Sequence, residues 1–332
     1  MRPRCAAVAA RATRFSCVSK VSTLVEQARA GQARAVARLI SLVEDDSPEL
    51  RSVAAELGPL TGRARVLGLT GPPGVGKSTS TSMLVSAFRA LDLRVGVLAI
   101  DPSSPFSGGA LLGDRIRMHS HTVDAGVFIR SMATRGALGG LATATPQAVR
   151  VLDAAGFDVV LVETVGVGQS EVDIVALADT TVVLLAPGMG DGIQAAKAGI
   201  LEVADVFVVN KADRDGADQT VRDLRHALSL GRRESGPSWR QPIVRTVATT
   251  SEGADDLMTA LEGHHEWLVT HGELESRRIR RASREIEAIA VASLRARLGG
   301  VSGGEALAGL AKQVAAGETD PYTAADQLTS EL

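Results

Sequence analysis

Residues 71–79, GPPGVGKST, have the residue types and the spacing that bind the phosphates of a nucleotide. Gly71, Gly76, Lys77 and Ser78 match the pattern G-x-x-x-x-G-K-[ST] between an apolar run and a helix-like stretch. The glycines allow a tight loop whose backbone N–H groups point at phosphate oxygens, and the following helix adds the positive end of its dipole. We expect Lys77 to reach the β- and γ-phosphates and the Ser78 hydroxyl to coordinate Mg²⁺.

Three acidic residues are candidates for further contacts with a magnesium ion. Asp101 ends the run RVGVLAID, Glu163 stands at the end of FDVVLVET, and Asp114 lies in GALLGDRIRM. Mg²⁺ prefers a shell of oxygen ligands, and carboxylates at the carboxyl ends of parallel strands fall at the ligand crevice of an open α/β sheet. For Asp114, the residues alone leave a helix cap as the alternative.

The base is predicted from Asn210-Lys211-Ala212-Asp213, which directly follows the apolar run VFVV. This N-K-x-D pattern is the guanine-reading pattern of G proteins. The Asp213 carboxylate can accept hydrogen bonds from N1–H and the exocyclic amine of guanine, whereas adenine would leave it unpaired at a high cost. We expect Asn210 to brace the loop and Lys211 to lie along the base. The loop of Ala248, Thr249 and Thr250 is assigned to the guanine oxygen by position alone. The predicted nucleotide-binding residues are Gly71, Gly74, Val75, Gly76, Lys77, Ser78, Thr79, Asn210, Lys211, Asp213, Ala248, Thr249 and Thr250.

The elements that must position these residues are short apolar runs that alternate with helical stretches. Runs that are apolar throughout suit strands buried on both faces of a mostly parallel sheet, and the alternation predicts a doubly wound α/β domain. The expected strands are RVLGLT, RVGVLAID, GVFIRSM, FDVVLVET, TTVVLLAP, DVFVVNKAD and PIVRTVAT.

Helical segments are expected on both sides of this core. Val21–Leu57 is Ala-rich and amphipathic and predicts one or two helices. Beyond residue 262, ELESRRIRRASREIEAIAVASLRARL predicts one long helix, GGVSGG ends it, and two shorter helices follow, the second beginning at Pro321. We therefore divide the chain into an N-terminal tail with helices (1–60), a nucleotide-binding domain (61–262) and a C-terminal helical region (263–332) that could form a dimer.

Composition excludes several classes of protein. The net charge of −2 argues against nucleic acid as a partner, and no apolar run reaches the roughly 18 residues of a membrane-spanning helix. The only cysteines, Cys5 and Cys17, exclude a disulfide framework and a four-cysteine zinc site. We expect a cytoplasmic protein that binds neither nucleic acid nor membrane. The Arg-rich, acid-poor start is also typical of a mitochondrial transit peptide, so the mitochondrial matrix is the alternative.

Taken together, the motifs resemble those of the methylmalonyl-CoA mutase accessory G proteins of the MeaB/ArgK type. The most specific segments are GPPGVGKST, AIDPSSPFSGGALLGDRIRM, ETVGVGQSEVDI, PGMGDGIQAAKAGILEVAD and NKAD. The resemblance implies a homodimeric GTPase that docks on the B12-dependent mutase, gates delivery of adenosylcobalamin and protects the enzyme. It also implies a mobile switch between Gly188 and Lys197. With it, the predicted metal ligands are Ser78, Asp101, Asp114 and Glu163, and the predicted catalytic residues are Lys77, Asp114 and Glu163.

The reaction itself is expected to be slow hydrolysis of GTP to GDP and phosphate. Glu163-Thr-Val-Gly166 replaces the Asp-x-x-Gly of Ras-like proteins, and Val167 stands where those proteins carry a glutamine that orients water. Two other functions stay open: a GTPase that serves another metallocentre, and a P-loop kinase or ATPase that serves amino-acid transport. The pattern N-K-A-D argues against the ATP-dependent alternative.

Overall fold

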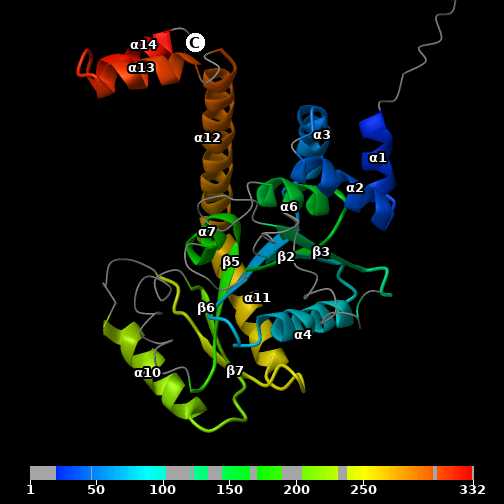
Figure 1. The fold of residues 1–332 in the computed structure, drawn as a ribbon. Helices are drawn as coiled ribbons and strands as arrows, with labels where there is room; N and C mark the ends of the chain where they lie inside the picture. Colours follow the sequence, from blue (N-terminus) through cyan, green and yellow to red (C-terminus); the bar gives the residue numbers. More distant parts are fainter. Residues whose placement is uncertain are drawn as a thin grey trace, which may run out of the picture. The chain divides into compact units, whose positions relative to one another are not determined.

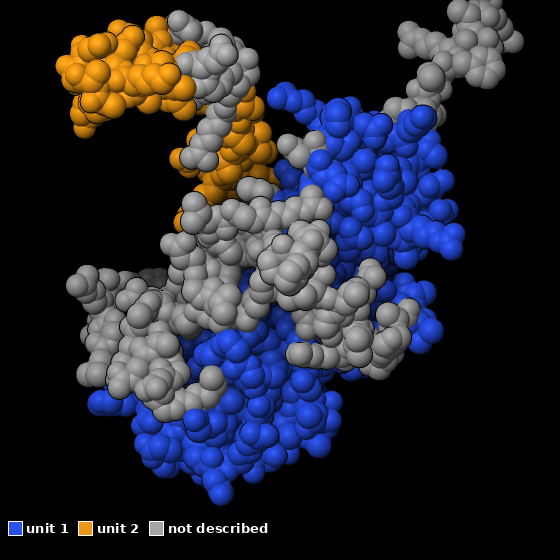
Figure 2. Space-filling view, viewed as in Figure 1, with its two compact units in different colours: residues 1–261 blue, residues 262–332 orange. Residues whose placement is uncertain are grey.

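The computed structural model of the chain divides into two compact units, residues 1–261 and residues 262–332 (Figures 1 and 2). The predicted division at residues 60 and 262 into three functional regions stays a prediction. The residues that the structure describes are 20–45, 47–101, 121, 123–133, 144–164, 170–188, 204–230, 238–301 and 305–330.

The first unit is built on a seven-stranded sheet in the order β3-β2-β4-β1-β5-β6-β7. Every neighbouring pair is parallel, so the predicted doubly wound α/β core is confirmed. The loop after β1 lies where the strand order reverses between the two halves of the sheet, which is where such sheets bind ligands. The strands are β1 (Arg65–Thr70), β2 (Val95–Asp101), β3 (Val127–Ala133), β4 (Val159–Glu163), β5 (Thr180–Leu185), β6 (Val206–Asn210) and β7 (Ile243–Thr246).

Helices cover both faces of this sheet (Figure 1). In β4, Val162 packs with residues of the N-terminal helices and α6 (Thr145–Ala154), whereas Leu161 packs with α4 (Lys77–Ala90) and α11 (Ala254–Thr270). Residues of α7 (Ser170–Leu177) join the first cluster, and α10 (Ala217–Leu230) packs on Phe207 of β6. Because strand residues alternate between faces, strands that are apolar throughout are the ones that both helical layers can bury.

The N-terminal segment forms three helices rather than the one or two predicted: α1 (Lys20–Arg29), α2 (Ala33–Glu44) and α3 (Leu50–Leu57), followed by a 3₁₀ turn at Gly58–Leu60. Gly31 ends α1, with φ of +83° and a bond from Gln32 N to Gln27 O of 3.0 Å, as in a Schellman cap. Pro48 disfavours helix in the residue before it and so helps to separate α2 from α3. Arg130 of β3 pairs with Glu44 of α2, which ties these helices to the sheet.

The second unit contains the long helix α12 (Glu273–Val301), then α13 (Glu305–Ala315) and α14 (Pro321–Ser330). The predicted end of the long helix at Gly299 was wrong by a few residues, since α12 continues through Gly299 and Gly300. Helix α14 begins at Pro321, as predicted, and the Asp320 carboxylate accepts the Thr323 N–H at 3.1 Å as its cap. Among the described residues, no helix combines the length and apolar character needed to cross a membrane.

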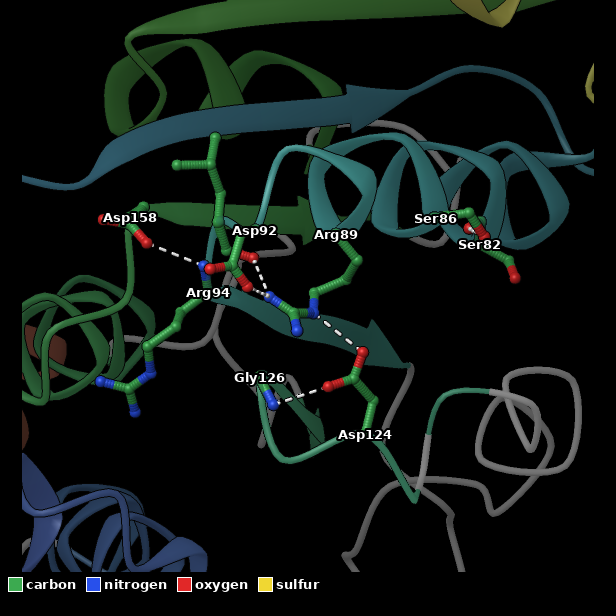
Figure 3. Close-up of polar contacts among 9 residues, drawn as sticks. Ser82, Ser86, Arg89, Asp92, Arg94, Asp124, Gly126 and Asp158 are labelled. Atoms are coloured by element: carbon green, nitrogen blue, oxygen red, sulfur yellow. Dashed lines mark hydrogen bonds and ion pairs between the residues drawn. The ribbon is translucent and has the colours of Figure 1, made fainter.

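The C-terminal end of α4 is joined by polar contacts to the segments just before β2 and β3 (Figure 3). Arg89 Nε donates to Asp124 Oδ2 at 2.8 Å, and Arg89 Nη1 donates to the Leu93 carbonyl at 2.8 Å. Gly126 N–H donates to the other Asp124 oxygen at 2.8 Å. The Asp124 pKa is lowered, first by the Arg89 hydrogen bond and then by the Gly126 N–H. Helix α4 therefore has a defined position on the sheet from which it presents the residues at its other end.

Candidate nucleotide-binding site

The loop between β1 and α4 takes a path that its glycines make possible. Gly71 and Gly76 have φ of +142° and +93°. A Cβ atom on Gly71 would lie 2.2 Å from the Leu184 carbonyl oxygen of β5, and one on Gly76 would lie 2.5 Å from Asn210 Nδ2. Residues with a side chain therefore cannot replace either glycine without moving a neighbouring strand or Asn210.

Lys77 and Ser78 open α4 directly after this loop, as the sequence predicts. Lys77 is buried, and its Nζ donates to the carbonyls of Gly71 at 2.8 Å and Pro72 at 3.1 Å. The amine therefore lies over the loop rather than in solvent. Gly74 and Thr79 are exposed on the same loop and first turn. A phosphate at this helix end would meet both the backbone N–H groups and the lysine charge.

Glu163 ends β4 beside the loop and is hydrogen-bonded to α4 through both carboxylate oxygens. The parallel pairing of β1 with β4 sets Leu69 against Glu163, one residue before the end of β1. Ser78 Oγ donates to Glu163 Oε1 at 2.7 Å, and Thr81 Oγ1 donates to Glu163 Oε2 at 3.0 Å. The structure thus brings together the predicted ligands Ser78 and Glu163. Sequence reasoning missed Thr81, although its position three residues after Ser78 places it on the same helix face.

The other predicted acids are placed only in part. Asp101 ends β2, and pairing of Ala99 with Glu163 puts the ends of β2 and β4 at the same edge of the sheet. Asp114 and Val167 lie outside the described residues, as does the predicted switch from Gly188 to Lys197 beyond Gly188 itself. Coordination by Asp101 and Asp114 therefore stays a prediction.

Asn210 joins three loops at the end of β6. Its side chain is 2% exposed, and its Nδ2 donates to the Val75 carbonyl of the phosphate loop at 2.8 Å. Its Oδ1 accepts from Thr246 Oγ1 at 3.2 Å and from Ala248 N–H at 3.1 Å. The phosphate loop and the two loops predicted to read the base are thereby locked together, which is the bracing that the sequence predicts for Asn210.

Lys211 and Asp213 lie on the turn that follows. Lys211 has φ of +57°, and its Nζ donates to the Gly74 carbonyl at 2.6 Å, a contact with the phosphate loop that the sequence did not indicate. The Asp213 side chain is exposed, and within the described part of the chain no group donates a hydrogen bond to it. The Asp213 carboxylate is therefore placed to accept bonds from a ligand.

The loop after β7 contains a second group for the base. Ala248 N–H is used by Asn210, and Thr250 N–H donates to the Val247 carbonyl at 3.0 Å. The backbone N–H of Thr249, between them, donates to no acceptor among the described residues. Of the three residues predicted to contact the guanine oxygen, Thr249 is thus the one whose N–H is available.

Known proteins are similar to this chain over most of its length. A protein of Pyrococcus abyssi that is named as a GTPase is 49% identical over 316 residues, which covers 94% of this chain and 97% of the relative. The mouse protein "Methylmalonic aciduria type A homolog, mitochondrial" is 37% identical over 268 residues, covering 79% of this chain and 63% of that protein. The crystal structure of a LAO/AO transport system kinase matches with a TM-score of 0.66 at 27% identity, covering 93% of this chain and 96% of that one.

The family itself is established by residues 36–301, which match the family described as "Methylmalonyl Co-A mutase-associated GTPase MeaB". The matched range contains the phosphate loop, Glu163 and Asn210-Lys211-Ala212-Asp213, the residues from which the sequence predicts a guanine-nucleotide site. The chain, a P-loop GTPase, belongs to the MeaB family.

Proposed function

We propose that this GTPase is Mg²⁺-dependent and acts as a chaperone for adenosylcobalamin-dependent methylmalonyl-CoA mutase, gating cofactor loading and protecting the enzyme. The observation that carries its nucleotide chemistry is the position of Asn210, which links the phosphate loop to the N-K-A-D turn and to the loop after β7. One residue thus sets the distance between the groups that would hold phosphates and those that would read a base. The description of the family supports the mutase as partner.

Guanine selectivity rests on the exposed Asp213 carboxylate and the Thr249 N–H. The carboxylate accepts from N1–H and the exocyclic amine of guanine, and the N–H donates to the guanine oxygen. Adenine has an acceptor at N1 and no carbonyl oxygen, so both groups would stay unpaired. Competition of GDP and ADP for the purified chain tests this, and GDP should bind about 10³-fold more tightly or better. Equal affinities would favour the alternative, a kinase or ATPase that serves amino-acid transport.

The residues around Ser78 fit a magnesium ion. A serine hydroxyl has one proton and two lone pairs. Ser78 donates its proton to Glu163, so its oxygen would act toward a cation as an electron-pair donor. Hydroxyl and carboxylate oxygens are the ligands that Mg²⁺ prefers. Ser78 would hold the ion, with Asp101, Asp114 and Glu163 around it, and the ion would neutralise charge on the phosphate oxygens.

We propose Lys77, Asp114 and Glu163 as the residues that take part in GTP hydrolysis. Lys77 would exchange its two carbonyl acceptors for phosphate oxygens and offset the charge that develops there. Glu163 would orient Ser78, and Asp114 would act in the switch. Since Val167 cannot orient water, we expect slow hydrolysis by the chain alone. Release of phosphate at several turnovers per second, measured without a partner, would contradict this expectation.

The homodimer is proposed from α12. Ile279, Ile286, Ile289 and Leu294 are exposed on this helix, and their successive spacings of three to seven residues put them along one stripe. Exposed apolar stripes of this kind commonly mark contacts between proteins.

The alternative to the mutase as the enzyme that this GTPase serves is an enzyme with another metallocentre. Affinity capture from cell extract decides between them, because the mutase should be retained by the chain and other metalloenzymes should not.

A further inference from the structure

Thr81 and Ser78 present two hydroxyls to one carboxylate from a single face of α4. They lie three residues apart, which makes them neighbours on a helix surface. All three side chains are buried, with Thr81 at 0% and Glu163 at 5% exposure. Each Glu163 carboxylate oxygen accepts a hydrogen bond from one of the two hydroxyls. Oε1 accepts from Ser78 Oγ at 2.7 Å, and Oε2 accepts from Thr81 Oγ1 at 3.0 Å. Both carboxylate oxygens are therefore bonded to α4, and one of the two bonds comes from Thr81, which lies outside the pattern G-x-x-x-x-G-K-[ST].

The Thr81 hydroxyl also lies 3.0 Å from the Lys77 carbonyl, so its single proton has two acceptors. A hydrogen bond to an ionised carboxylate is the stronger of the two. The bond to the Lys77 carbonyl is the usual back-bond of a threonine inside a helix and favours the rotamer that faces Glu163. The back-bond thus keeps the hydroxyl within reach of Glu163, and the bond that holds the carboxylate forms when the proton points to Oε2.

We propose that Thr81 is a positioning residue that orients Glu163 and thereby sets the affinity of the nucleotide-bound protein for Mg²⁺. With Oε2 held by Thr81, Oε1 faces Ser78 and accepts its proton, so the Ser78 oxygen would meet a cation as an electron-pair donor. Without the Thr81 hydroxyl, Oε2 loses one of the bonds that hold it to α4, and the carboxylate is less firmly directed toward Ser78. The inference rests on the proposed binding of Mg²⁺ at Ser78.

Substitutions at Thr81 test this role with matched controls. Thr81→Val keeps the shape and removes the hydroxyl, whereas Thr81→Ser keeps the hydroxyl. Ser80→Ala removes a neighbouring buried hydroxyl that has no hydrogen-bond partner among the described residues. The readout is the rate at which a fluorescent GDP analogue leaves the full chain as the Mg²⁺ concentration is varied. This rate reports metal binding independently of catalysis.

We expect Thr81→Val to raise the Mg²⁺ concentration needed for half-maximal retention by about 10- to 100-fold, the usual effect of losing a group that orients a ligand. Thr81→Ser and Ser80→Ala should stay near wild type, and all four proteins should release the analogue equally fast in excess EDTA. If Thr81→Val does not fold, Thr81→Ala replaces it with the same expectation.

Two results would overturn the inference and are distinguishable. If Thr81→Val needs the same Mg²⁺ concentration as wild type for half-maximal retention, Thr81 does not orient the metal site. That result would leave the proposed function intact. A wild-type protein whose release rate is independent of Mg²⁺ would contradict the proposed metal itself, and the role of Thr81 with it.

Discussion

At the scale of single residues, the candidate site depends on side chains that connect loops rather than on many contacts to one loop. Asn210 is the clearest case, because its three hydrogen bonds reach the phosphate loop, β7 and the loop after β7. Lys211 adds a fourth link, to Gly74. Asp213 has no such partner among the described residues, which leaves its carboxylate for recognition.

Asp213→Asn should change which base is bound. An amide at this position offers one acceptor and one donor, so it cannot accept from both N–H groups of guanine, whereas xanthine has an oxygen at C2 that accepts from the amide. We expect affinity for GDP to fall by about 10²-fold or more and affinity for XDP to rise. Isothermal titration calorimetry with both nucleotides measures the change.

The neighbouring exposed acid provides the control for this substitution. Asp215→Asn removes the same charge two residues away and should leave both affinities unchanged. Loss of GDP binding in both variants would mean that the effect is general electrostatics, and the assignment of Asp213 to the base would fail.

At the scale of elements, α4 is held at its two ends by different chemistry. Its N-terminal turn is joined to β4 through Glu163, and its C-terminal turn is joined to Asp124 through Arg89. Because Ser78 is carried on this helix, its position relative to the ends of β1 and β4 depends on both attachments.

The Arg89–Asp124 hydrogen bond should make the stability of the fold depend on pH. The pKa of Asp124 is lowered in the folded protein, chiefly by the Arg89 hydrogen bond. The ionised carboxylate therefore stabilises the fold above the unfolded pKa of about 3.9, and this contribution is lost as pH falls through the lower folded pKa. Asp124→Asn should lower the melting temperature at pH 7, and its difference from wild type should shrink as pH falls below about 4. Thermal unfolding of both proteins between pH 7 and about pH 3 measures this difference in melting temperature.

Asp92→Asn is the matched control, because the Asp92 side chain is fully exposed and its Oδ1 lies 3.8 Å from Arg89 Nη1. It should shift the melting temperature little at any pH, as exposed ion pairs do. A difference between Asp124→Asn and wild type that stays constant down to pH 3 would contradict the proposed linkage.

The elements also show what the sequence could predict. The seven strands follow from apolar runs, since a strand covered by helices on both faces has few positions that face solvent. The edge strands β3 and β7 carry polar side chains at Arg130 and Arg245. The break at Gly31 and the extension of α12 through Gly299 and Gly300 were not predicted. Both depend on whether a glycine ends a helix or lies within it, which local sequence decides only weakly.

The candidate site was predicted in its loops but not in its cross-links. The motifs indicate which loops meet, because each follows a strand of a parallel sheet. The bonds from Thr81 to Glu163 and from Lys211 to Gly74 join positions far apart in the chain. The spacing of Thr81 from Ser78 gives its helix face, but no spacing rule gives the partner of Thr81 or of Lys211. They depend on how closely α4 packs on β4 and on how near the turn after β6 lies to the phosphate loop.

At the scale of the whole molecule, the second unit carries the surface proposed for self-association. Ile286 is 68% exposed near the middle of the apolar stripe of α12. Ile286→Glu puts a charge at the centre of the proposed contact and should convert a dimer to a monomer, as measured by light scattering coupled to size-exclusion chromatography.

The control for this surface is a charged residue of the same helix outside the stripe. Arg284→Glu should leave the dimer intact, because Arg284 is exposed on the face of α12 that lies away from the stripe. A wild-type chain that is monomeric at all concentrations would contradict the proposed role of α12, while leaving the nucleotide site unaffected.

The central claim is that the nucleotide bound to this chain controls its association with methylmalonyl-CoA mutase. A nucleotide shifts a partner only by the difference in affinity between its two states. Size-exclusion chromatography of the chain with the mutase, in GDP and in a non-hydrolysable GTP analogue, measures that difference directly. We predict co-elution whose extent differs between the two nucleotides. No co-elution with either, or equal co-elution with both, would contradict the account.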